Sequence, residues 1–234
     1  LGFLAAGALF SFAPSSCLFA GAAAGALVFV SVLILDRPIQ PAVLAPPAAT
    51  SPETSSPVRE TKRSFLVAAL ISNLVLWGSL ATLKALAPKL GESLGVGALA
   101  TGSLLFLALS AQGAGFFLLG NSKRWTYRVG TLLAAVPAAL AGLALVYVAG
   151  AQSLGPVALG LVAAGAGAVV IGGAQAVTYT ASVFYSLDYD TKRGLRTGIH
   201  EAVLALGGSL PIVGGALADA SGNLQAPLLF MGAI

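Results

Sequence analysis

Long apolar stretches that are nearly free of charge alternate with short polar segments along this chain. A helix needs about 20 apolar residues to cross a bilayer core of about 30 Å. The pattern predicts complete spans near residues 15–35, 64–86, 94–120, 128–149, 156–186 and 197–218, and partial ones at 1–12 and from about 225 onward. We therefore expect an all-α membrane protein, a polytopic helical bundle with about six complete and two partial transmembrane helices.

Turn signals set the limits of these spans. Pro88 is expected to stop the span that opens near Ser64, and the Gly- and Pro-containing segment 150–156 divides the charge-free stretch 129–187 into two crossings. The chain starts and ends inside apolar runs, which leads us to expect that a helix is cut at each end.

Residues 36–63 form the one long interruption. They hold six prolines with interspersed Ser and Thr, and such a segment has little to bury and stays extended. We interpret it as a solvated linker between a short leading piece, 1–35, and a long trailing piece, 64–234.

The composition favours a lipid environment. Hydrophobic residues make up 57% of the chain and charged residues only 9%, whereas a soluble domain carries roughly 25% charged residues. The net charge of +4 does not indicate nucleic-acid binding, because the basic residues stand in short runs between apolar stretches instead of on one polar, aromatic-rich face. The bilayer itself is the expected partner.

The basic residues predict how the chain is oriented. All twelve are assigned to loops or helix ends, and ten of them fall in three segments separated by even numbers of crossings. These are Arg37, Arg59, Lys62 and Arg63, then Lys123, Arg124 and Arg128, then Lys192, Arg193 and Arg196. The opposite side carries only Lys84 and Lys89. Excess Lys and Arg mark cytoplasmic loops, so the linker is predicted to be cytoplasmic.

Two basic loops and one glycine-rich span carry a family resemblance. The loop 120–128 starts with glycine and holds Lys123, Arg124 and Arg128, although it lacks an aspartate; the loop 188–198 has an Arg193-Gly194 step. The next span contains Gly198, Gly207, Pro211, Gly214 and Gly215, with Leu210 before the proline. Together with six spans after a basic, Pro-rich linker, these features resemble the second half of a major facilitator superfamily transporter, in which each half is built of inverted three-helix units.

This resemblance implies a domain organisation and a function. Residues 1–35 would be the last helices of the N-terminal half, 36–63 the cytoplasmic linker, and 64–234 the C-terminal six-helix half. The chain would be a fragment of a secondary active transporter that moves a small solute by alternating access, and its missing N-terminal half would be a partner. The expected location is the cytoplasmic (inner) membrane of a bacterium, as a multi-pass protein.

Polar side chains within the spans are the candidates for a transport pathway. Polar groups at membrane depth face the bundle interior or a watery cavity, because lipid offers them no partner. The candidates are Asn73, Trp77, Gln112, Gln175, Tyr179 and Ser182. Hydrogen bonding between helices is the structural alternative for the amides Asn73, Gln112 and Gln175.

His200 and Glu201 are the only adjacent ionisable residues within a span. His200 is a candidate for proton coupling, since an unperturbed histidine has a pKa near ~6.5. Alternatively, Glu201 pairs with Arg128, Arg193 or Arg196 and latches a cytoplasmic gate; the short distance from the membrane surface favours this latch.

Small residues recur every four positions in the span 156–186, at Gly160, Ala164, Ala168 and Gly172. Such ridges allow helix backbones to approach closely in lipid, and with Gly207, Gly214 and Gly215 they are interpreted as helix-packing positions.

Catalytic patterns are absent from the sequence. One His and one Cys cannot form a metal-ligand cluster of the usual kind, and the chain has no Gly-x-Ser-x-Gly or Walker-type loop. We expect no metal, no cofactor and no enzyme activity. A lipid-modifying membrane enzyme and a non-transporting sensor or assembly subunit remain the alternatives.

Overall fold

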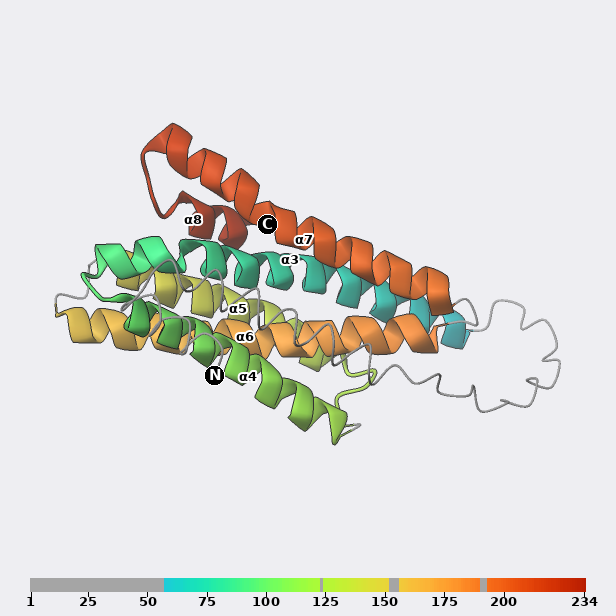
Figure 1. The fold of residues 1–234 in the computed structure, drawn as a ribbon. Helices are drawn as coiled ribbons and strands as arrows, with labels where there is room; N and C mark the ends of the chain where they lie inside the picture. The colour runs from blue at the N-terminus through green and yellow to red at the C-terminus, as the bar shows by residue number, and fades with distance from the viewer. Residues whose placement is uncertain (1–56, 123, 152–155, 190–192) are drawn as a thin grey trace, which may run out of the picture.

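The computed structural model describes residues 57–122, 124–151, 156–189 and 193–234. These residues form six helices (Figure 1): α3 Pro57–Ser93, α4 Ala98–Gly120, α5 Val129–Gly150, α6 Val157–Asp188, α7 Arg193–Ser221 and α8 Ala226–Ala233. The expected leading spans in 1–35 and the linker residues 36–56 lie outside the described residues.

Five of these helices, α3 to α7, are long and apolar enough to cross a membrane. They match the five complete spans expected after the linker, and the short helix α8 begins near the expected start of the next one. Their length and composition indicate an all-helical integral membrane protein. The major facilitator type of the bundle and its total of six complete and two partial spans stay predictions.

Two helices differ in extent from the sequence expectation. Helix α3 begins at Pro57, inside the segment assigned to the linker, and it continues through Pro88 to Ser93. A proline removes one helical hydrogen bond, but Ala87 and Leu90 are buried on either side of Pro88, and their packing maintains the helix. Helix α7 begins at Arg193, so the expected loop 188–198 is largely helical.

Lys84, which was expected close to the end of the span 64–86, has a different position in the longer helix α3. Lys84 lies inside α3, nine residues before its last residue, Ser93, and not at a helix end. Lys89 lies in the last two turns of the same helix and is exposed, in agreement with its assignment to a helix end.

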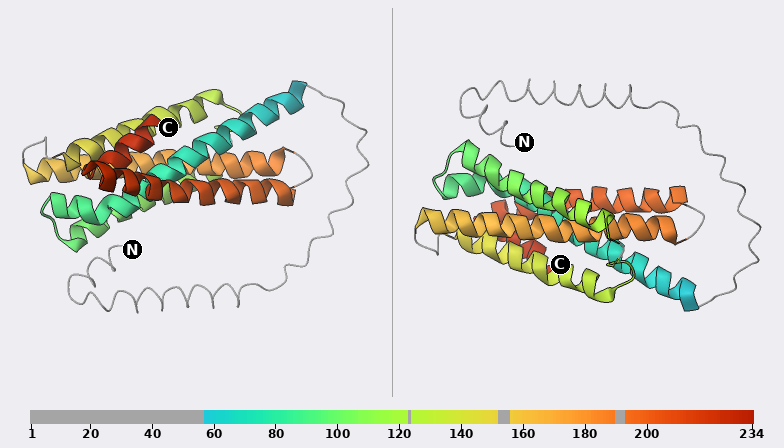
Figure 2. Two further views of the ribbon diagram at one scale, coloured as in Figure 1. Left: turned by 90° about the horizontal axis from the view of Figure 1, so that it is seen from above. Right: turned by 90° about the horizontal axis from the view of Figure 1, so that it is seen from below.

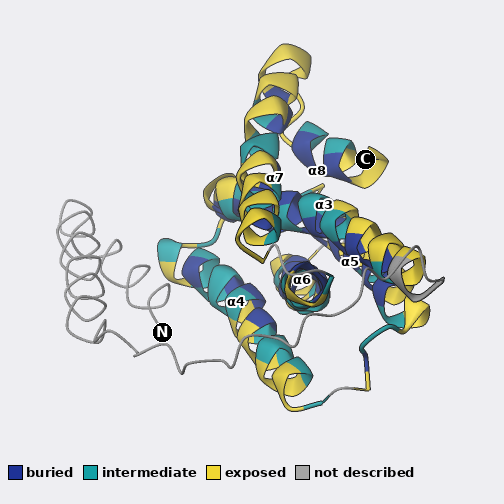
Figure 3. Ribbon diagram, turned by 90° about the vertical axis from the view of Figure 1, so that its right-hand side faces the viewer, coloured by how far each residue is buried: buried dark blue, intermediate teal, exposed yellow. Residues whose placement is uncertain are grey.

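Helix α6 lies at the centre of the bundle. Figure 3 shows it end-on with α3, α4 and α5 around it, and more of its residues are buried than of any other described helix. Helix α3 crosses obliquely over α6 (Figure 2) and also contacts α7. Successive long helices run in opposite directions, so the start of α3, the α4–α5 connection and the α6–α7 connection lie at one end of the bundle (Figure 1). These are the basic segments of the sequence, and we call this end of the bundle the basic end.

Close backbone contacts explain the small residues of α6. A Cβ added at Gly172 would lie 2.0 Å from the carbonyl oxygen of Ala108 in α4, and one at Gly167 would lie 2.6 Å from that of Gly142 in α5. Without a hydrophobic driving force between helices in lipid, such close packing is a main source of association.

The other expected packing residues are distributed over several contacts. Gly160, Ala164 and Ala168 are buried on α6. A Cβ at Gly207 of α7 would lie 2.7 Å from the carbonyl oxygen of Leu74 in α3, whereas one at Gly215 would meet nothing within 4 Å. A Cβ at Gly214 would lie 2.9 Å from Pro227 Cβ, near the start of α8.

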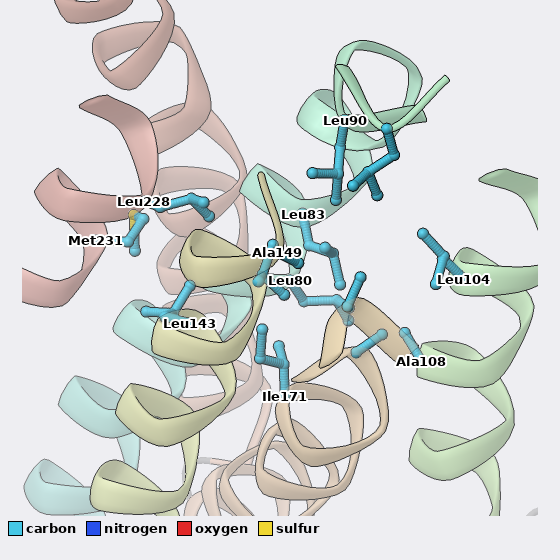
Figure 4. Packing of buried hydrophobic residues seen from close by; sticks show 14 residues of the cluster. Leu80, Leu83, Leu90, Leu104, Ala108, Leu143, Ala149, Ile171, Leu228 and Met231 are labelled. Carbon is cyan, nitrogen blue, oxygen red and sulfur yellow. The ribbon is translucent and has the colours of Figure 1, made fainter. Parts of the chain in front are cut away.

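A core of leucine, alanine and other apolar side chains joins α3, α4, α5, α6 and α8 near the end of the bundle opposite the basic segments (Figure 4). Its labelled members include Leu80 and Leu83 of α3, Leu143 of α5 and Ile171 of α6. This core fixes the positions of α3 and α6 relative to each other, and these two helices carry most of the polar residues discussed next.

Candidate functional site

Three rings, one each from α3, α4 and α7, pack around the ring of Tyr179 in α6. The ring centroid of Tyr179 lies 6.2 Å from that of Trp77 in α3, 5.3 Å from that of Phe116 in α4 and 5.2 Å from that of His200 in α7. The three aromatic side chains are half-buried, so part of each ring surface is uncovered in the described structure. We call these four residues the ring cluster.

His200 is held by a second residue of α6. The hydroxyl oxygen of Ser182 lies 3.0 Å from His200 Nδ1, at hydrogen-bond distance, while His200 is only 1% exposed. The other ring nitrogen, Nε2, has no hydrogen-bond partner among the described residues. One side of the imidazole is therefore fixed, and the other can bind a proton, water or a solute.

Two glutamines join α4 and α6 one turn away from the ring cluster. Gln112 Nε2 donates a hydrogen bond to Gln175 Oε1, and both side chains are buried. Gln175 Nε2 has no partner within the described part of the chain. The bond supports the structural role considered for these amides, while the free nitrogen allows a second role.

Asn73 lies one turn before Trp77 on α3 and is fully buried. Neither its amide nitrogen nor its amide oxygen has a partner among the residues that the structure describes. A buried polar group without a hydrogen bond costs about 1–3 kcal/mol, so each such atom calls for water, a solute or another chain.

The ring cluster and the amides lie on one side of the bundle. Helices α4 and α7 each contact α6 and α3 but not each other, and Phe116 and His200 extend from these two helices toward Tyr179 between them. Trp77 is at the middle of the predicted span Glu60–Ser93, and Gln175 is close to the middle of Val157–Asp188. Trp77 and Gln175 therefore lie near mid-depth, whereas Phe116 is four residues from the end of α4 and His200 is seven residues from the start of α7.

A second set of contacts connects three segments at the basic end. Lys62 Nζ in α3 lies 3.0 Å from Asp188 Oδ2 at the end of α6, and the Tyr127 hydroxyl, in the α4–α5 connection, donates to the same carboxylate oxygen. The Tyr127 backbone N–H donates to the hydroxyl of Tyr185 at 2.9 Å. Burial, followed by the hydrogen bond to Asp188 and its negative charge, raises the pKa of Tyr127 above its ordinary value.

The predicted gate residues are placed separately from this set. Glu201 is exposed on α7, and no ion pair links it to Arg128, Arg193 or Arg196 in the described residues. Arg128 and Arg193 are exposed, and the Arg196 guanidinium lies 4.6 Å from the Tyr189 ring centroid. The structure thus brings His200 to Tyr179 and Ser182, two of the predicted pathway residues, and leaves Glu201 exposed on the same helix.

Sequence reasoning did not select several residues of these sites. Phe116 is one turn after Gln112, a spacing that could have indicated it. Lys62, Tyr127 and Asp188 belong to the basic-end contacts; a tyrosine and an aspartate beside basic residues gave a weak signal for them. Lys84 was assigned to a helix end, where a lysine is expected to extend toward water, so its contact with Trp77 was not predicted.

Within the described ranges, no three His, Cys, Asp or Glu side chains gather in a way that would hold a metal ion. No protein-family model matches the sequence, and comparison with curated proteins and with solved structures found no significant match. The fold and the site therefore define an integral membrane protein of at least five long helices that places polar and aromatic groups at membrane depth.

Proposed function

We propose that this chain is the C-terminal half of a secondary active transporter of the major facilitator type, which moves a small solute by alternating access. The observation that carries the proposal is the set of buried polar atoms without partners, on Asn73, Gln175 and His200, near the half-buried ring cluster. Groups of this kind at membrane depth are expensive, and transporters keep them where a solute or water replaces the missing partner.

The arrangement of the helices supports a partner on this side of the bundle. In the proposed transporter an N-terminal half covers the side between α4 and α7, and the solute binds at the interface of the two halves near the midplane. The pathway residues are Asn73, Trp77, Gln112, Gln175, Tyr179 and Ser182, all from α3, α4 and α6. The basic end faces the cytoplasm of a bacterial cell in this proposal.

Alternating access by rocking requires each half to move as one body. The close contacts of α6 with α4 and α5, and the Lys62–Asp188 ion pair with its Tyr127 hydrogen bond, support this requirement for α3 to α6. His200 is the proposed proton-exchanging group, because its imidazole contacts Tyr179 and Ser182 of the pathway while Nε2 stays unpaired. Glu201 is exposed and has no such contact with the pathway residues.

Solute release from vesicles tests this function. The full-length protein is reconstituted in liposomes loaded with a defined mixture of sugars, amino acids, organic acids and nucleosides, and release is followed by mass spectrometry. We expect faster release of at least one compound than from protein-free liposomes. Release that is equal for every compound, with and without a membrane potential or pH gradient, contradicts the transporter assignment.

The same assay tests the pathway. The double variant Asn73→Leu/Gln175→Leu is expected to lose most of the release, whereas Ser110→Leu, at an exposed position of α4, keeps it. Unchanged release in a correctly folded double variant removes the pathway assignment and leaves the helices a structural role, as in a non-transporting membrane subunit.

A further inference from the structure

Lys84 occupies an unusual place for a lysine in a membrane-spanning helix. It lies about 13 Å along α3 from the last residue, Ser93, given a rise of ~1.5 Å per residue over nine residues. Its side chain is half-buried. A charged group inside a membrane span is rare, and it generally marks a functional site or has an acidic partner.

The ammonium group points toward the middle of the span. Lys84 Nζ lies 5.4 Å from the ring centroid of Trp77, which is seven residues, or about two turns, closer to the helix middle. A lysine near a helix end normally extends toward the closer interface, where its charge stays hydrated. Side chains on a helix lean toward its N-terminus, and here that direction brings the charge to the ring cluster.

No negative charge of the described chain compensates Lys84. The carboxylates of the described residues are Glu60, Glu92, Asp188, Glu201 and Asp219, and none lies within ion-pair distance of Lys84 Nζ. The cation–π contact with the Trp77 ring is favourable but does not neutralise the charge. An anion bound next to Trp77 would do so.

We infer that Lys84 and the ring cluster form a binding site for an aromatic monocarboxylate, with the carboxylate on the Lys84 ammonium and the aromatic ring of the solute against Trp77, Tyr179 and Phe116. This inference rests on the proposed transporter function and names its substrate class. A planar aromatic ring fits three half-buried aromatic side chains, which interact best in stacked or edge-to-face arrangements. The single cation matches a single carboxylate.

Equilibrium binding to the full-length protein in lipid nanodiscs tests the site without any transport step. Radiolabelled benzoate and benzamide have nearly the same shape and differ in charge at neutral pH. We expect the wild type to bind benzoate at least tenfold more tightly than benzamide, because a hydrogen bond between two charged groups is stronger than one between a charged and a neutral group. Lys84→Gln should lose this preference and bind both probes equally.

Two further variants complete the test. Lys89→Gln removes an exposed lysine five residues along the same helix and should keep the wild-type preference. Lys84→Arg retains the positive charge and should keep most of the preference for benzoate. This variant is compared with the wild type if Lys84→Gln does not fold. Unchanged benzoate preference in Lys84→Gln overturns the inference. So does a wild type that binds none of benzoate, phenylacetate and indole-3-acetate.

Vesicle release separates this inference from the transporter assignment. Benzoate binding that depends on Lys84, without release of any compound from proteoliposomes, keeps the anion site and contradicts transport. Release of other compounds with no Lys84-dependent binding of aromatic carboxylates keeps the transporter and contradicts the substrate class.

Discussion

Lys62 and Asp188 form an ion pair that ties the beginning of α3 to the end of α6, with 3.0 Å between Lys62 Nζ and Asp188 Oδ2. Tyr127 donates a hydrogen bond to the same carboxylate from the connection between α4 and α5. The basic loop 120–128 contains no aspartate or glutamate of its own. Asp188 supplies a carboxylate to this loop from a neighbouring helix instead, so one acidic residue stabilises three segments at the basic end.

Asp188→Asn is expected to lower the stability of the bundle modestly. The side chains of Lys62 and Asp188 are 32% and 39% exposed, and exposed ion pairs contribute about 0–1 kcal/mol. We expect the apparent melting temperature in nanodiscs to fall by a few degrees and the effect to shrink in high salt, because salt screens the pair. Asp219→Asn, at an exposed carboxylate on α7, is the control; an equal decrease in that variant contradicts a specific role for Asp188.

Tyr127 should make stability depend on pH in the alkaline range. An unfolded tyrosine loses its proton near pH ~10, whereas burial and the bond to Asp188 raise the pKa of Tyr127 in the folded protein. Above pH ~10 the unfolded state therefore binds fewer protons than the folded state, and stability falls as pH rises toward the folded pKa. Tyr127→Phe cannot lose this contribution.

Melting curves between neutral and strongly alkaline pH measure this effect. The stability advantage of the wild type over Tyr127→Phe should be largest at neutral pH and should decline above pH ~10. Tyr147→Phe, which removes a phenol from α5, is the control variant. In the described structure the Tyr147 hydroxyl has no hydrogen bond to a carboxylate. Parallel pH profiles for the wild type and Tyr127→Phe would contradict the role of the Tyr127–Asp188 bond.

Hydropathy predicted the number of long helices after the linker because an apolar run of that length has few alternatives in a bilayer. It placed helix ends less well. Pro88 was expected to end a helix, but the buried neighbours Ala87 and Leu90 hold α3 together beyond it. Arg193 and Gly194 were assigned to a loop and are the first residues of α7. Tertiary packing, which is not visible in local composition, decides such boundaries.

Gly172→Ala tests the close contact between α6 and α4. The added methyl group would lie 2.0 Å from the Ala108 carbonyl oxygen, a backbone atom that can move only if the helices separate. Overpacking of this kind typically destabilises by about 1–3 kcal/mol. We expect a clear decrease in the apparent melting temperature.

Gly173→Ala is the matched control for this contact, since a Cβ at the neighbouring position meets nothing within 4 Å. Alanine also favours the helix over glycine, so Gly173→Ala should be neutral or slightly stabilising. Equal effects of the two substitutions would mean that α4 and α6 do not approach each other as described.

Periodicity could group polar residues on one face of a helix, but it could not show which helices meet. Gln175, Tyr179 and Ser182 were selected from their spacing on α6. Their partners Gln112, Phe116 and His200 come from α4 and α7, and only the packing of the bundle brings them together. For the same reason the inward direction of Lys84 depends on its distance to Trp77 and not on its place in the sequence.

Gln112 and Gln175 allow a double-mutant cycle that separates structure from transport. Gln112→Leu and Gln175→Leu each leave one buried amide without its partner, which costs about 1–3 kcal/mol. The double variant removes both amides, so its stability should be higher than the sum of the single effects predicts, with a coupling of about 0.5–2 kcal/mol.

Solute release from the same three variants gives the second measurement. If Gln175 lines the pathway, the double variant recovers stability but not release, because the free amide Nε2 is still missing. Recovery of release together with stability would contradict a pathway role and assign both glutamines to helix packing.

His200 should determine how release depends on a proton gradient. Its Nδ1 lies 3.0 Å from the Ser182 hydroxyl, and Nε2 is free to take up a proton near the ring cluster. His200→Gln keeps a polar group of similar size that cannot exchange a proton at physiological pH. We expect this variant to release solute at a rate that no longer changes when a pH gradient is imposed.

The exposed neighbour Glu201 provides the control, and Glu201→Gln should keep the wild-type dependence. A gradient dependence that persists in a folded His200→Gln protein would contradict proton exchange by the imidazole. Loss of the dependence in Glu201→Gln instead would assign proton exchange to the exposed Glu201 carboxylate on α7.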